Sequence, residues 1–212
     1  MNIISHRGFW KTKREMNSRE AFSNAIRNNY GIETDVRDYC GEIVISHDIP
    51  SGKDVLTFEE FINNYKKDCS KYNSKITLAL NIKSDGLHIK ISKVLKEHNI
   101  DNYFLFDMSI PDSMNYIFLN LNVFYRMSEY ESISINVKNI QGVWLDQFKS
   151  NWYNKNMIDK IQNSWGEVCI VSPELHGRPY LDCWSILKHY KNKKKIMICT
   201  DFPDRAEEFF NG

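Results

Sequence analysis

The chain has 212 residues, 42% of them hydrophobic, which is enough for one sizeable core but close to the lower limit for a complete eight-stranded barrel. Its 28 Lys and Arg residues nearly balance its 27 Asp and Glu residues, so the overall charge favours neither nucleic acid nor an anionic membrane as a partner. No stretch approaches the roughly 20 apolar residues of a membrane-spanning helix. We therefore expect a single cytoplasmic domain over residues 1–212 without stable membrane insertion, and the oligomeric state stays open.

Short β-branched or apolar runs alternate along the chain with segments of helical spacing, a pattern typical of repeated βα units. In chain order, we predict strands at Asn2–Ser5, Gly31–Val36, Ile76–Ile82, Tyr103–Asp107, Val123–Arg126, Gly142–Asp146, Glu167–Val171 and Lys195–Thr200. The helices expected between and after them are Ser18–Asn29, Thr57–Asp68, Leu87–Glu97, Pro111–Leu119, Asn154–Asn163, Leu181–Tyr190 and Pro203–Phe209. A short extra strand is expected after the turn at Cys40-Gly41-Glu42, and Glu131–Val137 is the weakest helix of the series.

Several predicted helices carry start signals. Asn17 or Ser18 precedes the first, Thr57 and Glu60 have the spacing of a capping box, and Pro111 and Pro203 stand at first-turn positions. The alternation as a whole predicts the α/β class and a compact (β/α)8 TIM barrel, in which the carboxyl ends of the strands carry the chemistry.

Polar side chains, nearly all of them ionisable, lie at or near the carboxyl ends of most predicted strands. They are His6 and Arg7, Glu33 and Asp35, Asn81 and Lys83, then Asp107, Arg126, Asp146, Glu174, His176 and Asp201. A barrel would place such residues around one cavity. For Asp107 or Asp201 alone, a helix-capping or solvated position is an equal alternative.

The alternation of Glu33-Thr34-Asp35 directs both carboxylates to the same side of a strand. Two like charges so close together require a cation, and hard oxygen ligands favour Mg²⁺ or Ca²⁺ over zinc. The structural alternative is that Arg7, Arg37 or Lys83 neutralises the pair.

His6 and His47 each end an apolar run beside a charged neighbour, in His6-Arg7 and His47-Asp48. Because imidazole titrates near neutral pH, two such histidines facing one centre can divide the roles of general acid and general base. Arg7 can hold a phosphate oxygen, and Lys83 can offset charge that develops in the transition state.

Four blocks of the sequence resemble the signature of the glycerophosphodiester phosphodiesterase family. They are Ser5-His6-Arg7-Gly8, Glu20-Ala21-Phe22, Gly31-Ile32-Glu33-Thr34-Asp35-Val36 and Ile45-Ser46-His47-Asp48. The resemblance continues more weakly through Asn81-Ile82-Lys83 to Thr200-Asp201-Phe202-Pro203. It implies a (β/α)8 barrel that hydrolyses glycerophosphodiesters with a divalent metal, with His6 and His47 as the acid and base, Arg7 as a phosphate ligand, and Glu33 and Asp35 as metal ligands.

The chain departs from that family in three places. The family's Pro-Glu-Asn-Thr segment is Glu15-Met16-Asn17-Ser18 here, and the position of a third ligating glutamate is Asn81, which offers an uncharged amide oxygen. The capping insertion that many relatives carry after the His-Asp block is missing. An open site follows from its absence and favours a phosphodiester with large groups, such as a lipid head group, a polymer or a sugar phosphate.

Further residues are candidates for substrate contacts. They are Trp10, Arg126, Trp144, Asp146, Glu174, His176 and Arg178, and packing is an equal alternative for the two tryptophans.

The sequence thus predicts a metal-dependent phosphoric diester hydrolase. Its expected catalytic residues are His6, His47, Arg7 and Lys83, and its expected ligands for Mg²⁺ or Ca²⁺ are Glu33, Asp35 and Asn81. Two alternatives stay open. One is a phospholipase-type lyase that forms a cyclic phosphate. The other is a non-catalytic barrel that binds a phosphorylated ligand.

Overall fold

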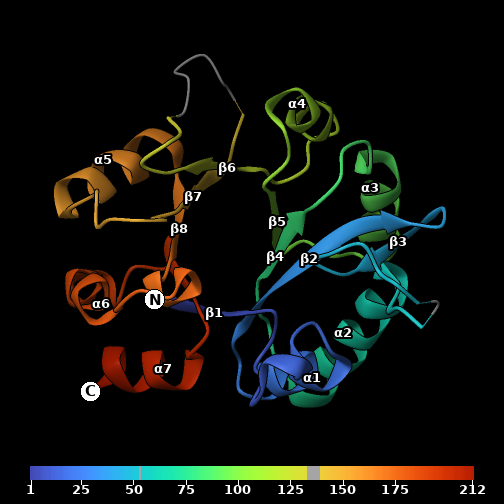
Figure 1. Ribbon diagram of the computed structural model, residues 1–212, viewed down its shortest axis with the longest axis horizontal. Helices are drawn as coiled ribbons and strands as arrows, with labels where there is room; N and C mark the ends of the chain where they lie inside the picture. Colours follow the sequence, from blue (N-terminus) through green and yellow to red (C-terminus); the bar gives the residue numbers. More distant parts are fainter. Residues whose placement is uncertain (53, 133–138) are drawn as a thin grey trace. The chain divides into compact units, whose positions relative to one another are not determined.

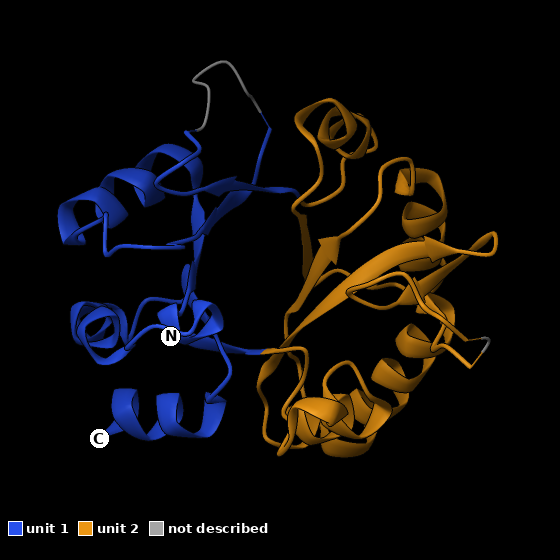
Figure 2. Cartoon of the chain, viewed as in Figure 1, with its two compact units in different colours: residues 1–5, 123–212 blue, residues 6–122 orange. Residues whose placement is uncertain are grey.

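The computed structural model describes residues 1–52, 54–132 and 139–212. The chain forms two compact units, which are described separately. Unit 1 consists of Met1–Ser5 and Val123–Gly212, and unit 2 of His6–Asn122 (Figure 2). In each unit the helices lie along one face of the strands, and strands and helices alternate along the chain (Figure 1).

Unit 2 begins at the last residue of strand β1 and contains the elements from η1 to α4. These are η1 (Lys13–Glu15), α1 (Arg19–Arg27), β2 (Gly31–Tyr39), β3 (Glu42–Ile45), α2 (Phe58–Tyr72), β4 (Leu78–Ile82), α3 (His88–Glu97), β5 (Tyr103–Phe106) and α4 (Ile110–Phe118). Strand β4 pairs in parallel with β2 on one side and with β5 on the other. Strand β3 runs antiparallel to the second half of β2, with Val36 opposite Ile45.

Unit 1 contains the first strand and the second half of the chain. Its elements are β1 (Asn2–His6), β6 (Phe124–Met127), β7 (Gly142–Leu145), α5 (Lys155–Trp165), β8 (Glu167–Val171), η2 (Pro173–His176), α6 (Leu181–Leu187), η3 (Lys188–Tyr190), β9 (Ile196–Thr200) and α7 (Pro203–Asn211). The pairings β1–β9, β9–β8, β8–β7 and β7–β6 are all parallel.

Alternating residues of the unit 1 strands face the helices and form a core with them. Val143, Val168 and Ile196 pack in this way against Trp184 of α6 and Phe210 of α7. Strands β7, β8 and β9 are buried along nearly their whole length, as expected for parallel strands covered on both faces. The core of unit 2 includes Phe61, whose ring contacts those of Phe22 and Phe58.

The sequence-based elements agree closely with the observed ones. Ser18, not Asn17, caps α1, and Thr57 and Glu60 form the expected capping box at the start of α2. The short extra strand is confirmed as β3. The predicted helix Leu181–Tyr190 is divided into α6 and the 3₁₀ turn η3, because the last turn tightens where the helix ends.

Two further comparisons concern loops. Of the predicted helix Glu131–Val137, residues 133–137 lie outside the described residues, and Glu131 forms an isolated bridge with Ser128. After β3, only residues 46–57 precede α2, so the chain has no inserted capping domain there. None of the described helices has the length and apolar character that crossing a bilayer requires.

Candidate active site

Strand β2 carries two buried carboxylates on one face. Glu33 is 1% exposed and Asp35 is not exposed at all, whereas Thr34 between them points to the other side, as strand alternation dictates. The register of β2 and β4 places Asn81 opposite Asp35 and the small Ala79 opposite Glu33. On the paired strand, the two acids therefore face one amide and one methyl side chain.

The end of β1 brings two basic side chains to these carboxylates. His6 Nε2 lies 3.8 Å from Glu33 Oε2, and Arg7 Nε lies 2.9 Å from Asp35 Oδ2. The Arg7 backbone N–H also donates to Glu33 Oε2 at 3.2 Å.

The chain turns sharply directly after His6, and this turn aims the two basic side chains. Arg7 has φ 57°, in the left-handed region, and Gly8 has φ 85°. A Cβ on Gly8 would lie 2.8 Å from the Ala21 carbonyl carbon, so only glycine lets α1 approach this closely.

Lys83, directly after β4, completes the basic surroundings of Asp35. Its Nζ lies 3.4 Å from Asp35 Oδ1 and 3.5 Å from Asp107 Oδ2, at the end of β5. Arg7 and Lys83 therefore neutralise Asp35 as the structural alternative anticipated. In the described contacts, Arg37 does not pair with Asp35; its Nη1 donates to the His47 carbonyl oxygen at 3.0 Å.

Asn17 connects both faces of β2. Its Nδ2 donates to Asp35 Oδ2 at 3.0 Å, and its Oδ1 accepts the Thr34 hydroxyl at 2.8 Å. Glu15, in the same altered segment, instead accepts hydrogen bonds from the Lys11 backbone N–H and the Thr12 hydroxyl. Asn17, and not Glu15, is thus the residue of this segment that reaches the buried carboxylates.

Burial and the neighbouring Asp35 carboxylate raise the pKa of Glu33 from its ordinary value of 4.5 to about 7, while His6, Arg7 and Lys83 act in the opposite direction. Glu33 therefore changes charge near neutral pH, in contact with the imidazole of His6. A group that titrates in this range suits proton transfer or cation binding.

The residues around β2 fit a hard divalent cation that takes few ligands from the protein. Asp35 Oδ1 and Asn81 Oδ1 are buried and accept no hydrogen bond within the described part of the chain, although Asp35 Oδ1 also forms the ion pair with Lys83. A cation would satisfy both oxygens and relieve the repulsion between Glu33 and Asp35. Among the described residues, no group of three or more His, Cys, Asp or Glu side chains could hold a metal.

His47 follows β3, whose last residue lies opposite Val36 in the middle of β2. The preceding Ser46 N–H donates to the Asp35 carbonyl oxygen at 3.0 Å. The His47 side chain is 45% exposed, and its Nδ1 lies 2.9 Å from Asp48 Oδ1. Its ring is thus oriented by a carboxylate, and its backbone is anchored to the strand that carries the acids.

Trp10 contacts the same turn. Its Nε1 donates to the His6 carbonyl oxygen at 2.9 Å, which fixes the indole against the end of β1. This contact gives Trp10 a local structural role whether or not it also meets a substrate.

In unit 1 the predicted substrate contacts form their own set of interactions. His176 Nε2 lies 2.7 Å from Asp146 Oδ1, and Arg126 forms two hydrogen bonds with Glu131, at 2.6 and 2.9 Å. Trp144 of β7 is buried, and Asp146 directly follows the end of this strand. The burial of this indole agrees with the alternative that Trp144 is a packing residue.

Glu174 and Arg178 are engaged by the protein itself. The Glu174 carboxylate accepts hydrogen bonds from the Ser172 and Thr200 hydroxyls and from the Asp201 N–H. These contacts join the ends of β8 and β9, and burial raises the pKa of the Glu174 carboxyl. Arg178 Nη1 donates to the Gln147 carbonyl oxygen at 2.7 Å.

Sequence reasoning did not identify several residues that shape the surroundings of Asp146. Glu129, Tyr130, Gln147 and Phe148 all follow the ends of β6 or β7. The sequence signal that could have identified them was their position directly after predicted strands. Gln147 is uncharged and Phe148 apolar, so a search for ionisable groups passes over both.

No protein-family model and no curated protein sequence matches the chain. Solved structures do resemble it. A glycerophosphodiester phosphodiesterase from Agrobacterium tumefaciens str. C58 gives a TM-score of 0.71 at 14% identity, covering 100% of both chains. A dihydropteroate synthase from Anaplasma phagocytophilum with bound 6-hydroxymethylpterin-monophosphate gives 0.55 at 10% identity, covering 100% of this chain and 97% of that one.

A Rubisco-like protein from Rhodopseudomonas palustris gives a TM-score of 0.54 at 11% identity, covering 99% of this chain and 62% of that one. Such low identities show the fold alone. That fold is the compact (β/α)8 barrel, so the predicted fold class is confirmed.

Proposed function

We propose that the chain is a divalent-cation-dependent phosphoric diester hydrolase, acting on a glycerophosphodiester or on a larger lipid- or sugar-linked phosphodiester. One observation carries the proposal. The buried carboxylates of Glu33 and Asp35 meet the basic side chains of His6, Arg7 and Lys83 within 3.8 Å. The structural likeness to a glycerophosphodiester phosphodiesterase supports the same reaction class.

In this proposal the basic side chains divide the work. Arg7 binds a non-bridging phosphate oxygen, because a guanidinium forms paired charge-assisted hydrogen bonds with oxyanions. Lys83 stabilises the charge that accumulates on the phosphoryl oxygens in the transition state. Its contacts with Asp35 and Asp107 hold the ammonium group in place before substrate binds.

The two histidines transfer the protons. One of His6 and His47 removes a proton from the attacking water, and the other donates a proton to the leaving alcohol oxygen. Glu33 and Asp48, which contact the two rings, orient them and stabilise their charged forms.

Glu33, Asp35 and Asn81 would hold the cation. When bound, it would act as a Lewis acid on a phosphate oxygen. Asn81 contributes no charge, so we expect weaker metal binding than three carboxylates would give, and Asn81→Glu should strengthen it. The metal affinity of the purified protein, measured by calorimetry with Mg²⁺ and Ca²⁺, checks this point apart from activity.

The decisive experiment combines substrate and metal. Hydrolysis of bis-p-nitrophenyl phosphate and of glycerophosphodiesters is measured with Mg²⁺, Ca²⁺ or EDTA, in wild type, His6→Ala and His47→Ala. We expect activity that EDTA abolishes and each substitution lowers by at least about 100-fold, the usual contribution of a general acid or base. Full activity in both mutants would refute the assignment.

Product analysis separates hydrolysis from the two alternatives. A cyclic phosphate that accumulates would identify a lyase-type reaction. Binding of a phosphorylated ligand without turnover would identify a non-catalytic barrel. The observation at this site that favours this alternative is the uncharged Asn81. His98→Ala is a suitable matched control, since His98 directly follows α3 as its C-cap and has none of the proposed roles.

A further inference from the structure

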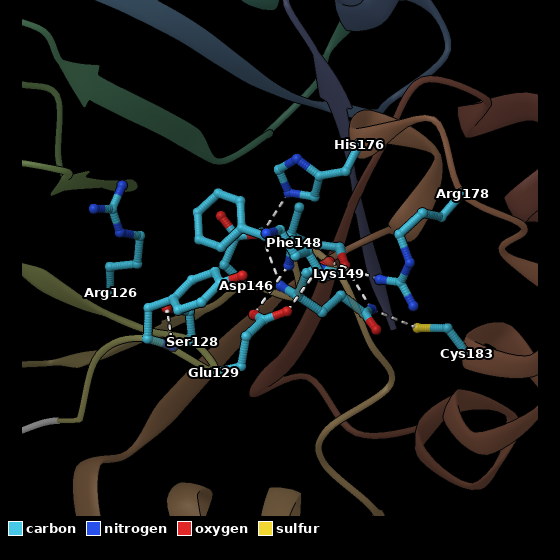
Figure 3. A network of polar contacts seen from close by, with 12 residues as sticks. Arg126, Ser128, Glu129, Asp146, Phe148, Lys149, His176, Arg178 and Cys183 are labelled. Carbon is cyan, nitrogen blue, oxygen red and sulfur yellow. Dashed lines mark hydrogen bonds and ion pairs between the residues drawn. The ribbon is translucent and has the colours of Figure 1, made fainter.

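Unit 1 contains a series of neighbouring rings, tilted against one another by 36° and 49°, that ends in a histidine held by a buried carboxylate. The rings belong to Tyr130, Phe148 and His176, and the carboxylate to Asp146. These residues follow the ends of β6, β7 and β8. Figure 3 shows His176 beside Phe148, and a hydrogen bond joins His176 Nε2 to Asp146.

From this arrangement we propose that unit 1 carries a binding site for a neutral polyhydroxylated ring, such as a cyclitol or a pyranose sugar. The ring would stack on Tyr130 and Phe148 and donate a hydroxyl hydrogen bond to His176 Nδ1. This inference goes beyond phosphodiester cleavage, because it concerns the residues of unit 1 alone and predicts binding without a phosphate.

The apolar surface of the site is continuous. The ring centroids of Tyr130 and Phe148 are 6.1 Å apart, and those of Phe148 and His176 are 4.7 Å apart. Tyr130 is 62% exposed, so the series opens to solvent at that end. Aromatic faces of this kind bind the C–H face of a ring ligand while its hydroxyls remain free for polar contacts.

The polar end of the site has a defined direction. Asp146 Oδ1 accepts a hydrogen bond from His176 Nε2 at 2.7 Å and another from the Gln147 N–H at 2.8 Å. An ionised carboxylate only accepts, so His176 must carry a proton on Nε2. In the neutral imidazole, Nδ1 then holds the lone pair and accepts a hydrogen bond from a ligand hydroxyl.

Hydrogen bonds formed by Glu129 and Gln147 hold the loop that carries Phe148. The Glu129 carboxylate accepts hydrogen bonds from three consecutive backbone N–H groups, those of Phe148 at 3.0 Å, Lys149 at 2.6 Å and Ser150 at 3.2 Å. Gln147 Nε2 donates to the Tyr153 hydroxyl and the Val171 carbonyl oxygen inside the unit. The ring of Phe148 is therefore positioned before any ligand arrives, which lowers the entropic cost of binding.

The charges near the rings favour a neutral ligand. The Arg126 guanidinium lies 5.8 Å from the centre of the Phe148 ring, but both of its hydrogen bonds to Glu131 already engage it with a carboxylate. Lys149 Nζ lies 5.8 Å from the centre of the Tyr130 ring. Asp146 and Glu129 add negative charge. An anionic ligand would therefore gain little electrostatic binding free energy here, and binding of an uncharged polyol does not depend on this term.

Ligand binding is tested by NMR on the full chain with free, phosphate-free probes. We expect myo-inositol and methyl β-D-glucopyranoside to give saturable shifts of the Phe148 and His176 signals, with millimolar dissociation constants. Glycerol, which has no ring, should bind at least about fivefold more weakly. No saturable shift at the solubility limit of myo-inositol would overturn the proposal, as would tighter binding of adenosine than of either polyol.

Substitutions locate the site. Tyr130→Ala and Phe148→Leu should each weaken binding by about fivefold to tenfold. Tyr72→Ala, at a tyrosine of unit 2, is the matched control and should leave binding unchanged. His6→Ala should also leave it unchanged, so the polyol site and the proposed hydrolysis can succeed or fail separately. Equal binding by Phe148→Leu and wild type would place the ligand elsewhere.

The tautomer of His176 gives a readout that is independent of affinity. Long-range ¹H–¹⁵N spectra should show its proton on Nε2 in the neutral state, and Asp146→Asn should shift the population toward Nδ1–H. A wild-type His176 protonated mainly on Nδ1 would contradict the proposed acceptor. Loss of the Nε2 preference in Asp146→Asn, together with weaker polyol binding, would identify Asp146 as the positioning residue.

Discussion

Three non-glycine residues around the buried acids have left-handed backbone conformations. They are Arg7 with φ 57°, Asn17 with φ 59° and Asp107 with φ 74°. Such conformations cost about 1 kcal/mol or more for residues with a Cβ, although Asn and Asp tolerate them better than most. At each of these positions the turn directs a side chain to Asp35 or to its partner Lys83. Local strain thus accompanies the convergence of charge.

Substitutions of Asn17 separate the cost of the left-handed backbone from the contribution of the side-chain hydrogen bonds to stability. Asn17→Gly removes the hydrogen bonds to Thr34 and Asp35 but accepts the positive φ, whereas Asn17→Ala removes the bonds and adds strain. We expect both variants to lower the free energy of unfolding, with Asn17→Ala about 1 kcal/mol less stable than Asn17→Gly. Urea denaturation measures both values.

Asn29 is the matched control for Asn17, because it has φ 58° and an exposed side chain. Asn29→Ala and Asn29→Gly should differ by a similar amount, through conformation alone. If Asn17→Gly were as stable as wild type, the contacts of Asn17 with the acids would contribute nothing to stability.

The titration of Glu33 predicts a pH dependence. Its folded pKa is about 7 and its ordinary value is 4.5, so the folded protein retains a proton that the unfolded chain has already lost. Stability from this group is therefore complete below pH 4.5 and declines as pH rises to 7, by about 3 kcal/mol in total.

This dependence is measured by urea denaturation in EDTA between pH 4.5 and 7.5. Glu33→Gln should remove the decline, since glutamine does not ionise. Glu97→Gln, on the exposed side of α3, should keep it. A decline of equal size in Glu33→Gln would assign the titration to another group.

At the scale of elements, the two amino-terminal motifs that carry the predicted catalytic histidines lie where a strand ends and a turn begins. The His6-Arg7-Gly8 turn joins β1 to the region that packs on α1, and the Phe9 N–H donates to the Ala21 carbonyl oxygen at 2.9 Å. The Ser46-His47 segment is anchored to β2 in the same manner. Backbone contacts between elements therefore set the positions of the two predicted catalytic histidines.

The start of α2 tests how much one cap contributes. The Thr57 side chain accepts the Glu60 N–H, and the Glu60 carboxylate accepts the Thr57 N–H. Thr57→Ala should lower stability by about 1 kcal/mol and the melting temperature by about 3 °C for a chain of this size. Thr57→Ser retains the hydroxyl and should remain within a few tenths of a kcal/mol of wild type, as judged by calorimetry.

At the scale of the whole molecule, the sequence predicts one domain, whereas the contacts divide the chain into two compact units. The prediction is tested by hydrogen exchange with mass spectrometry across a urea series. If the chain is one cooperative domain, peptides from β2 and α2 of unit 2 and from β8 and α6 of unit 1 should lose protection at the same urea concentration. Separate midpoints would show that the two units unfold independently.

The (β/α)8 class was accessible from the sequence for a physical reason. Parallel strands buried on both faces appear as short apolar runs, and amphipathic helices between them have a period of 3.6 residues. The split of Leu181–Tyr190 and the short 3₁₀ turns η1 and η2 were beyond this signal, because segments of three or four residues have no measurable period.

By itself, the sequence determined the elements, their caps and the shared face of Glu33 and Asp35, since these depend on residues close together along the chain. Only the tertiary structure decided the partners: Arg7 and Lys83 on Asp35, Asn17 between Thr34 and Asp35, and His176 between Phe148 and Asp146. Local periodicity specifies which side of an element is buried. Which distant side chain meets it depends on how the strands are paired and on where each turn directs the chain.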